Sequence, residues 1–239
     1  MNKKIIIGIA TIIIIAILGI VGCLYLSKKS AFNIIQNVKQ PEGASDVDDK
    51  TREDNKKSLV VYFSIPETDD VSNGVTTDEE NSIIVVDGKV LGNTQYVAML
   101  ISEKIGADIY RIEPKIPYTK EHSDLISQAK EEKSQNLRPK IKKPISNFND
   151  YDTIYVGYPI WFDDLPQIMY TFFESYDFSG KIVIPFSTHG GSGLADTVNI
   201  IKGMTKAKVE TNAFTISRDN MERASDEVKI WLKEIGRLE

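Results

Sequence analysis

From residue 58 onward, short apolar runs alternate with segments whose apolar residues recur at helical spacing. Runs such as Leu59-Val60-Val61-Tyr62-Phe63 are almost continuously apolar, which is typical of strands buried on both faces of a sheet. The segments between them place apolar residues three or four positions apart, as in amphipathic helices. We predict strands over 59–63, 109–112, 153–157, 181–186 and 209–216, and helices over 94–105, 123–133, 166–175, 194–202 and 222–238.

This alternation predicts an α/β fold with a doubly wound five-stranded parallel sheet in a three-layer α/β/α arrangement. Strands that alternate with helices form parallel sheets, and right-handed crossovers place helices on both faces. In such sheets a ligand binds beyond the carboxyl ends of the strands, where the strand order reverses. The loops after the first, third and fourth strands are therefore the places where we expect a site.

The first 57 residues follow a different pattern. Residues 5–26 carry no charge, and as a helix they would span roughly 33 Å, close to the hydrocarbon thickness of a bilayer. We predict a transmembrane or signal anchor over 1–29, a polar linker over 30–57 and one folded domain over 58–239. Alternatively, Ile20-Val21-Gly22-Cys23 resembles a bacterial lipobox in which Cys23 would carry the lipid. Either anchor places the protein at a bacterial cell membrane, and the short segment before residue 5 favours an extracytoplasmic domain.

Charge and composition narrow the function classes. The four basic residues of 1–29 are all lysines and that segment has no acid, so residues 30–239 carry 25 basic and 34 acidic residues, a net −9. An acidic domain argues against a nucleic-acid partner. One cysteine excludes an intramolecular disulfide, and His122 and His189 are the only histidines, so we expect no metal site.

The loop after the third predicted strand contains adjacent large aromatics, Trp161 and Phe162, preceded by Tyr158-Pro159-Ile160. Exposing both rings would be costly unless a planar ligand stacks on them. The alternative is that the rings fold back onto the core. Asp163 and Asp164 follow, and we hypothesise that their charge lowers the reduction potential of a bound redox group.

The other two loops suit polar ligand atoms. After the fourth strand, Thr188, His189, Gly190, Gly191, Ser192 and Gly193 lead into a helix, and such glycines permit close backbone approach. After the first strand, Ser64 is separated from the helix start at Asn93-Thr94 by an acidic insertion over 65–91, which contains a predicted hairpin turning at Asp87-Gly88. Hydroxyl and amide groups at a helix N-terminus suit a phosphate.

Together these loops resemble those of the flavodoxin family, over residues 58–239. The resemblance implies strand order 2-1-3-4-5 and a bound flavin mononucleotide (FMN). It implies that Ser64, Asn93 and Thr94 hold the phosphate. Pro159, Ile160, Trp161 and Phe162 would line one side of the isoalloxazine ring, and Thr188, His189, Gly190, Gly191, Ser192 and Gly193 would contact its pyrimidine edge through backbone groups. Two departures stand out: the insertion divides the phosphate loop, and Trp161 is not followed by glycine.

Three functions fit this sequence. The first is an FMN-binding electron-transfer protein tethered to the membrane through residues 5–26, with redox donor and acceptor proteins or small acceptors as partners. The second is an FMN-dependent NAD(P)H:quinone or small-acceptor oxidoreductase. The third is a flavodoxin-shaped binding module without cofactor. No side-chain nucleophile is evident, so we assign no catalytic residue; His189 could bond to the flavin, donate a proton or only support its loop.

Overall fold

The computed structural model describes residues 57–69 and 82–239. The predicted anchor, Cys23 and the linker up to residue 56 lie outside the described residues. By backbone contacts the chain divides into two units, one of 1–38 with 86–89 and one of 39–85 with 90–239, and the second contains the central sheet. None of the helices within 57–69 and 82–239 combines the length and apolar character needed to cross a membrane.

The central sheet is parallel throughout and has the predicted order. Its strands are β1 (Ser58–Tyr62), β4 (Asp108–Arg111), β5 (Thr153–Pro159), β6 (Ile182–His189), β7 (Lys208–Val209) and β8 (Phe214–Ser217). They run β4-β1-β5-β6-β7, and β8 also pairs with β6. Counted along the chain this order is 2-1-3-4-5, so the predicted flavodoxin-like α/β fold is confirmed. A separate two-stranded hairpin, β2 (Ile83–Val86) and β3 (Lys89–Gly92), turns at Asp87-Gly88 as predicted.

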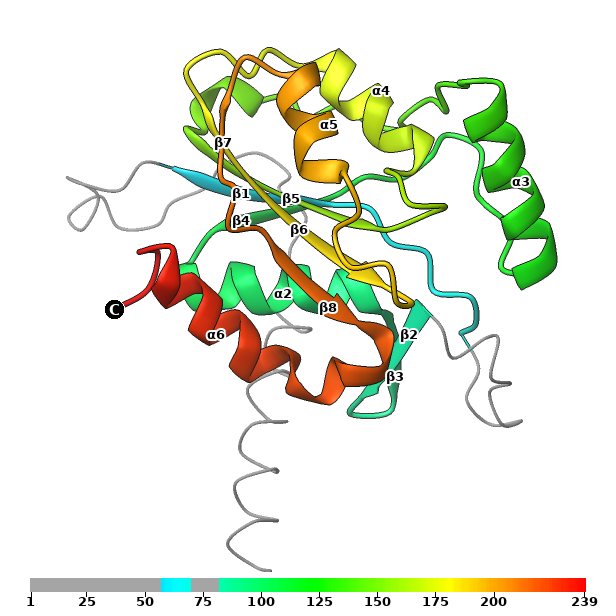
Figure 1. Ribbon diagram of the computed structural model, residues 1–239, viewed down its shortest axis with the longest axis horizontal. Helices are drawn as coiled ribbons and strands as arrows, with labels where there is room; N and C mark the ends of the chain where they lie inside the picture. The colour runs from blue at the N-terminus through cyan, green and yellow to red at the C-terminus, as the bar shows by residue number, and fades with distance from the viewer. Residues whose placement is uncertain (1–56, 70–81) are drawn as a thin grey trace, which may run out of the picture. The chain divides into compact units, whose positions relative to one another are not determined.

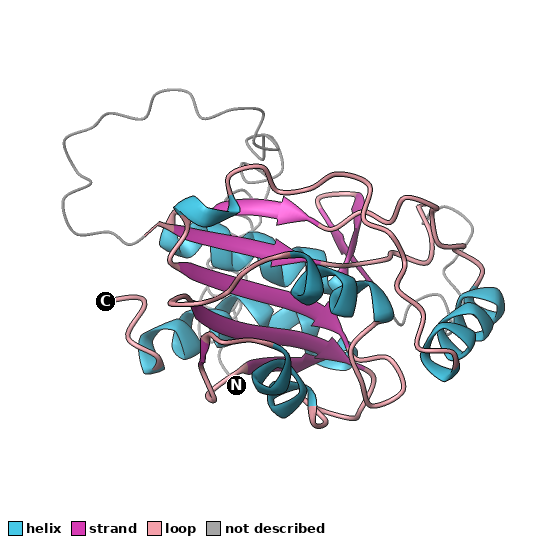
Figure 2. Ribbon diagram, turned by 90° about the horizontal axis from the view of Figure 1, so that it is seen from above, coloured by secondary structure: helices cyan, strands magenta, loops and turns pink. Residues whose placement is uncertain are grey.

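Helices cover both faces of the sheet (Figure 1). On one face lie α2 (Asn93–Ile105) and α6 (Ala224–Glu234), and on the other lie α4 (Gln167–Ser175) and α5 (Thr197–Met204). The polar helix α3 (His122–Ser134) covers neither face. In Figure 1 and Figure 2 it stands beyond the edge at which the parallel strands end. A helix in that place is free to contribute to a ligand site.

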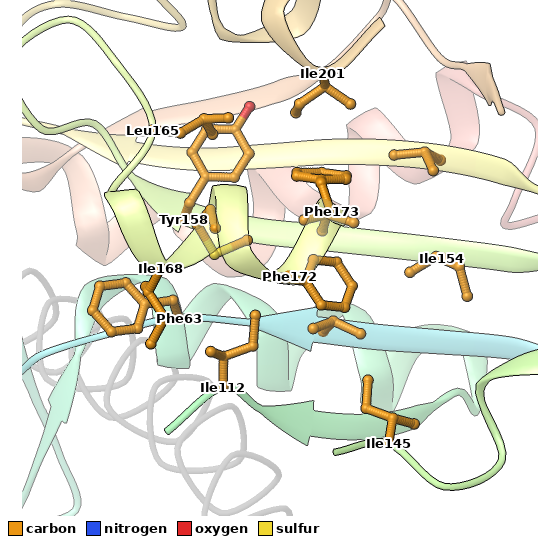
Figure 3. Close-up of a cluster of buried hydrophobic side chains, with 14 of the residues drawn as sticks. Phe63, Ile112, Ile145, Ile154, Tyr158, Leu165, Ile168, Phe172, Phe173 and Ile201 are labelled. Atoms are coloured by element: carbon orange, nitrogen blue, oxygen red, sulfur yellow. The ribbon is translucent and has the colours of Figure 1, made fainter. Parts of the chain in front are cut away.

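The core between the sheet and α4 follows from strand alternation. Every second residue of β1 and its extension points to the same face, so Leu59, Val61 and Phe63 enter one cluster. Figure 3 shows Phe63 with Ile168 and Phe172 of α4 in this cluster. Burying each such side chain contributes about 1.5–3 kcal/mol. This packing fixes the end of β1, from which the first site loop departs.

Three predicted elements differ from the structure at the carboxyl-terminal end of the chain. The single strand predicted over 209–216 is wrong, because the chain turns between β7 and β8. There the Glu210 carboxylate accepts the N–H groups of Thr211 and Asn212 at 2.8 and 2.9 Å. The helix predicted from residue 194 begins only at Thr197, since Ala195 has a φ of 47°, outside the helical region.

The last predicted helix, 222–238, is shorter than expected. A 3₁₀ helix over Arg218–Arg223 precedes α6, and the Ser217 hydroxyl caps it by accepting the Asp219 N–H at 3.3 Å. At the other end Gly236 has a φ of 67°, and left-handed glycine is a usual helix stop.

Candidate cofactor site

A pocket of about 210 Å³ opens at the carboxyl ends of the strands. A single water needs roughly 10–15 Å³ on this measure, so the pocket can hold part of a multi-ring ligand. The loops after β1, β5, β6 and β8 and the helices α2 and α3 all contribute to its wall. Ten of the thirteen predicted site residues line it: Ser64, Asn93, Thr94, Pro159, Ile160, Trp161, Phe162, Thr188, His189 and Gly190.

The sheet register brings two of the predicted loops together. Pro159 of β5 pairs with Thr188 of β6, and the Ile160 N–H donates to the Thr188 carbonyl at 2.9 Å. The Thr188 hydroxyl in turn lies 2.7 Å from the hydroxyl of Thr94, at the start of α2. The loops after β5 and β6 and the α2 N-terminus therefore meet at one point of the pocket.

The α2 N-terminus has the features of an anion site. Its N-cap residue is Gly92, which offers no side chain to the first N–H groups of the helix. Ser64 lies directly against this glycine, because a Cβ built on Gly92 would come within 2.1 Å of the Ser64 Oγ. The backbone amide groups at a helix start and the helix dipole favour a phosphate there. The two halves of the phosphate loop, divided in the sequence, are thus adjacent in space.

Trp161 is held in the pocket wall by two other rings. Phe63 and Tyr118 lie 5.5 and 5.6 Å from it, both edge-on. Edge-to-face pairs of this kind add about 0.5–1.5 kcal/mol each to the area they bury. Trp161 is half-buried. Its ring packs on Phe63 and Tyr118, as the alternative of folding back onto the core expects, and it also lines the pocket, where a planar ligand could stack on it.

Phe162 is 40% exposed and belongs to a tight turn. Trp161 and Asp164 exchange backbone hydrogen bonds of 3.0 and 3.1 Å, and the two residues between them, Phe162 and Asp163, have φ values of 54° and 58°. Two successive positive φ angles are typical of a type I′ turn, which usually takes glycine or asparagine. Phe162 and Asp163 therefore adopt the left-handed conformation although neither is glycine. In the family that the sequence resembles, many members have a glycine in this loop.

The two aspartates of this turn differ in their surroundings. The Asp164 carboxylate accepts from the Leu165 N–H and the Tyr170 hydroxyl at 2.7 and 2.8 Å, and Lys133 lies 3.3 Å away. Its charge is thus partly compensated. Neither Asp163 nor Asp164 lines the pocket, so the hypothesis that they lower a reduction potential now rests mainly on the exposed Asp163.

His189 is fixed in one tautomer by its own loop. Its Nδ1 accepts the Gly191 N–H at 2.9 Å, so in the neutral ring the proton resides on Nε2. Burial lowers the pKa of His189 below its ordinary value, and the charge of Asp219 opposes this in part. At neutral pH the ring therefore offers a neutral N–H donor.

The second half of the glycine-rich loop does not reach the pocket. Gly191 and Ser192 are exposed, Gly193 is half-buried, and none of the three lines the cavity. The loop turns away because the Gly191 N–H bonds back to His189, and because Gly191 and Gly193 have φ values of 143° and 61°. The expected contacts to the cofactor are thus restricted to Thr188, His189 and Gly190.

Arg218 is a pocket residue that the sequence analysis missed. It follows β8 directly, and a Cβ on Gly190 would come within 2.8 Å of its guanidinium, so that glycine permits the two segments to pack. The strand-end rule that identified the other loops also applies to the loop after the fifth strand, which was not considered. Arg218 places a positive charge beside His189 and Gly190 in the pocket wall.

A second missed group comes from the insertion and from α3. His122, Leu125, Ile126 and Ala129 recur at the spacing of one helix face, and Ile65, Glu67 and Ser82 lie on either side of residues 70–81. No motif marks these positions, because the contacts join Glu67 to His122 across 55 residues of sequence.

A comparison with known proteins identifies the family of the chain. A family model described as Flavodoxin matches residues 82–235, more than half of the chain, and the chain therefore belongs to the flavodoxin family. No curated protein matches it.

The chain is also similar to solved structures of proteins described as flavoproteins. One from Bacteroides eggerthii is 28% identical, covering 76% of this chain and 99% of its own, with a TM-score of 0.57. A second, from Bacteroides uniformis, is 28% identical over 72% and 97%, with a TM-score of 0.55. A flavoprotein in complex with FMN, from Lactobacillus acidophilus, is 18% identical over 74% and 99%, with a TM-score of 0.47.

Proposed function

We propose that the protein binds FMN in this pocket and transfers electrons through it. The observation that carries the proposal is the meeting of an N-terminus of α2 without a side-chain cap, the Thr94–Thr188 hydroxyl pair and the Trp161 wall around one cavity. When bound, FMN supplies the redox chemistry, and the protein supplies orientation and electrostatics.

The residues present fit the three parts of FMN. Ser64, Asn93 and Thr94 would hold the phosphate at the α2 N-terminus, where the missing side chain of Gly92 lets Ser64 lie close to the start of the helix. Pro159, Ile160, Trp161 and Phe162 form the wall for the planar ring. Thr188, His189 and Gly190 offer polar groups to its pyrimidine edge, and Arg218 adds a positive charge there.

Fluorescence of the two tryptophans tests this arrangement. Trp161 lines the pocket, whereas Trp231 is 4% exposed on α6 and bonds to the Asn212 carbonyl. In Trp231→Phe, equimolar FMN should strongly quench the remaining emission, and the protein should be yellow. In Trp161→Phe the quenching should be much weaker. Protein that stays colourless and does not quench FMN fluorescence would instead favour a binding module without cofactor.

A second candidate is an FMN-dependent oxidoreductase that uses NAD(P)H or reduces a small acceptor. It is favoured by the paired Glu67 and His122 in the pocket wall, since an electron carrier has no need of such a pair inside its site. Oxidation of NAD(P)H by the holoprotein without an added reductase would support this function. If the protein is an electron carrier instead, its partners are redox donor and acceptor proteins or small acceptors.

We further propose that residues 5–26 tether the domain to a bacterial membrane, with the domain on the extracytoplasmic side. The support is the uncharged apolar run itself, with lysines at both ends. A membrane-impermeant amine reagent should label the domain on intact cells, and absence of labelling would contradict the orientation. Replacing Cys23 by serine distinguishes the anchors, because only lipidation requires that thiol.

A further inference from the structure

The side of the pocket next to α3 contains a buried carboxylate. The Glu67 side chain is 4% exposed, and both of its oxygens have partners. Oε1 accepts the Ser82 hydroxyl at 2.5 Å, and Oε2 contacts Nδ1 of His122. A buried carboxylate requires such partners to offset its lost hydration. The three residues therefore form one connected polar group, and all three line the pocket.

His122 is placed so that its second ring nitrogen remains available. Its side chain is 30% exposed, and within residues 57–69 and 82–239 Nε2 has no hydrogen-bond partner. Because Glu67 occupies Nδ1, the ring orientation is fixed. Glu67 also compensates the positive charge that the ring carries when Nε2 is protonated, as a carboxylate does for a catalytic histidine.

Beyond Glu67 and Ser82, the pocket wall next to His122 is apolar along α3. Leu125, Ile126 and Ala129 lie on the same face of α3 and line the same pocket. Across it, Lys133 donates to the Phe162 carbonyl at 2.7 Å and so ties α3 to the turn that follows Trp161. This part of the pocket thus combines an aliphatic wall, an aromatic wall and one hydrogen-bond donor at its end.

We propose that Glu67 and His122 form an acceptor subsite beside the flavin site, in which a quinone is reduced by two electrons. The proposal rests on FMN binding as proposed above. A flat ring suits the apolar walls, and a carbonyl oxygen suits the Nε2–H of His122. The buried Glu67 and the net −9 of residues 30–239 disfavour the phosphates of a dinucleotide at this end.

Reduction of the quinone to the hydroquinone requires one hydride and one proton. Bound FMN in its reduced form would supply the hydride, which carries two electrons and one proton. An oxygen of the quinone accepts the proton of His122 Nε2, and the product leaves as the hydroquinone. Solvent then returns a proton to Nε2. His122 is the catalytic residue of this step, and Glu67 is a positioning residue that acts through it.

Two oxidants distinguish proton donation by His122 from electron transfer alone, because one needs protons and the other does not. The FMN-loaded full chain is photoreduced and mixed with tetramethyl-1,4-benzoquinone or with ferricyanide, which takes one electron and no proton. Removing a general acid costs about 10²–10⁴-fold in rate. His122→Gln should slow quinone reduction about 100-fold, and Glu67→Gln about ten-fold, while oxidation by ferricyanide is unchanged in both. Asp124→Asn, an exposed amide-for-carboxylate change on α3, should leave both rates unchanged.

A binding measurement provides a readout that does not depend on turnover. With only two histidines in the chain, the ring nitrogen signals can be assigned from His122→Gln and His189→Gln. Adding tetramethylhydroquinone to the oxidised holoprotein should shift the nitrogens of His122. In Glu67→Gln the shift should be smaller.

Unchanged quinone rates in His122→Gln, or equal loss with both oxidants, would overturn the subsite, and so would hydroquinone that shifts no His122 nitrogen. Loss of FMN affinity in His122→Gln would place His122 in the flavin site instead. Wild-type protein that fails to bind FMN would defeat the proposed function itself. In that event the hydroquinone titration of cofactor-free protein still decides whether the subsite exists.

Discussion

At the scale of single residues, Gly92 decides whether the divided phosphate loop can function. The insertion separates Ser64 from Asn93, yet the two halves meet because residue 92 has no side chain. Any Cβ there would overlap the Ser64 hydroxyl, and that hydroxyl lies against the backbone rather than at the end of a long flexible chain. The close approach of two backbones at an anion site is a common reason for glycine.

Gly92→Ala should therefore weaken FMN binding more than ten-fold, about 1.4 kcal/mol, because the Ser64 hydroxyl must leave its place. Gly203→Ala is the matched control: it lies inside α5, and a Cβ there meets nothing within 4 Å. It should bind FMN like the wild type and be equally stable or more so, since alanine is the better helix former. Fluorescence titration with FMN measures both. Equal FMN affinity in the two variants would show that FMN binding does not depend on the missing side chain at residue 92.

His189 gives the domain a specific response to acid. Burial keeps its pKa below the ordinary 6.5, so the unfolded chain binds this proton at a higher pH than the folded chain does. Its contribution to the free energy of unfolding is complete above about pH 6.5 and is lost progressively as the pH falls through the lowered value. His189→Gln should therefore lose less stability than the wild type between pH 7.5 and 5.0.

Urea unfolding at the two pH values measures this difference. The carboxylates titrate in both proteins, so the comparison isolates the histidine. Parallel losses in wild type and variant would show that His189 titrates equally in the folded and unfolded states.

At the scale of elements, α3 depends on few contacts at the pocket. Lys133 bonds to the Phe162 carbonyl at 2.7 Å and lies 3.3 Å from Asp164, and Lys130 lies 5.6 Å from the centre of the Phe162 ring. Lys133 is partly exposed, and partly exposed charged contacts contribute about 0.2–1 kcal/mol. Small changes here should therefore alter how α3 meets the pocket without unfolding the sheet.

Lys133→Met should speed amide hydrogen exchange across 122–134 several-fold and weaken FMN binding by less than ten-fold. Lys229→Met, an exposed lysine on α6, is the control and should change neither. Exchange followed by mass spectrometry would show the effect. If α3 exchanged at the wild-type rate, the Lys133 contacts would not be what holds the helix to the turn.

Some helices, strands and loops of the domain could be predicted from the sequence, and others could not. Strand alternation and helical periodicity predicted a parallel sheet with helices on both faces, because β1, β5 and β6 are apolar on both faces and have no other place to be buried. The order of the strands came only from the resemblance to the flavodoxin family. The strand-end rule then located Trp161, Thr188 and His189. The break between β7 and β8 could not be foreseen, because it rests on the Glu210 carboxylate accepting the backbone N–H groups of the next two residues.

The missed half of the site has a different cause. Glu67 belongs to the insertion after β1 and His122 to the start of the polar helix α3, and only the folded chain brings them together. For the glycine-rich loop the sequence predicted too many contacts with the cofactor rather than too few. Its composition predicted contact along its whole length, whereas the hydrogen bond from the Gly191 N–H to the His189 ring turns the second half away.

At the scale of the whole molecule, the net charge of −9 over residues 30–239 should govern exchange with charged partners. A negative surface attracts cationic reactants and repels anionic ones, and salt screens both effects over a Debye length of about 8 Å at physiological ionic strength. Arg218 adds a positive charge at the pocket but does not reverse this balance.

Oxidation of the reduced holoprotein by ruthenium hexaammine, a cation, should therefore slow as salt is raised, and oxidation by ferricyanide, an anion, should quicken. Steering of this kind changes rates by roughly ten-fold or more between low and physiological salt. Stopped-flow traces in 10 and 150 mM salt measure both reactions on one protein sample. Salt effects of the same sign for the two oxidants would contradict steering by the net charge, and would mean that the local field of Arg218 and its neighbours controls access to the cofactor. Opposite signs would show that the net charge of the domain governs access to the cofactor, and such a charge favours partners with a basic surface.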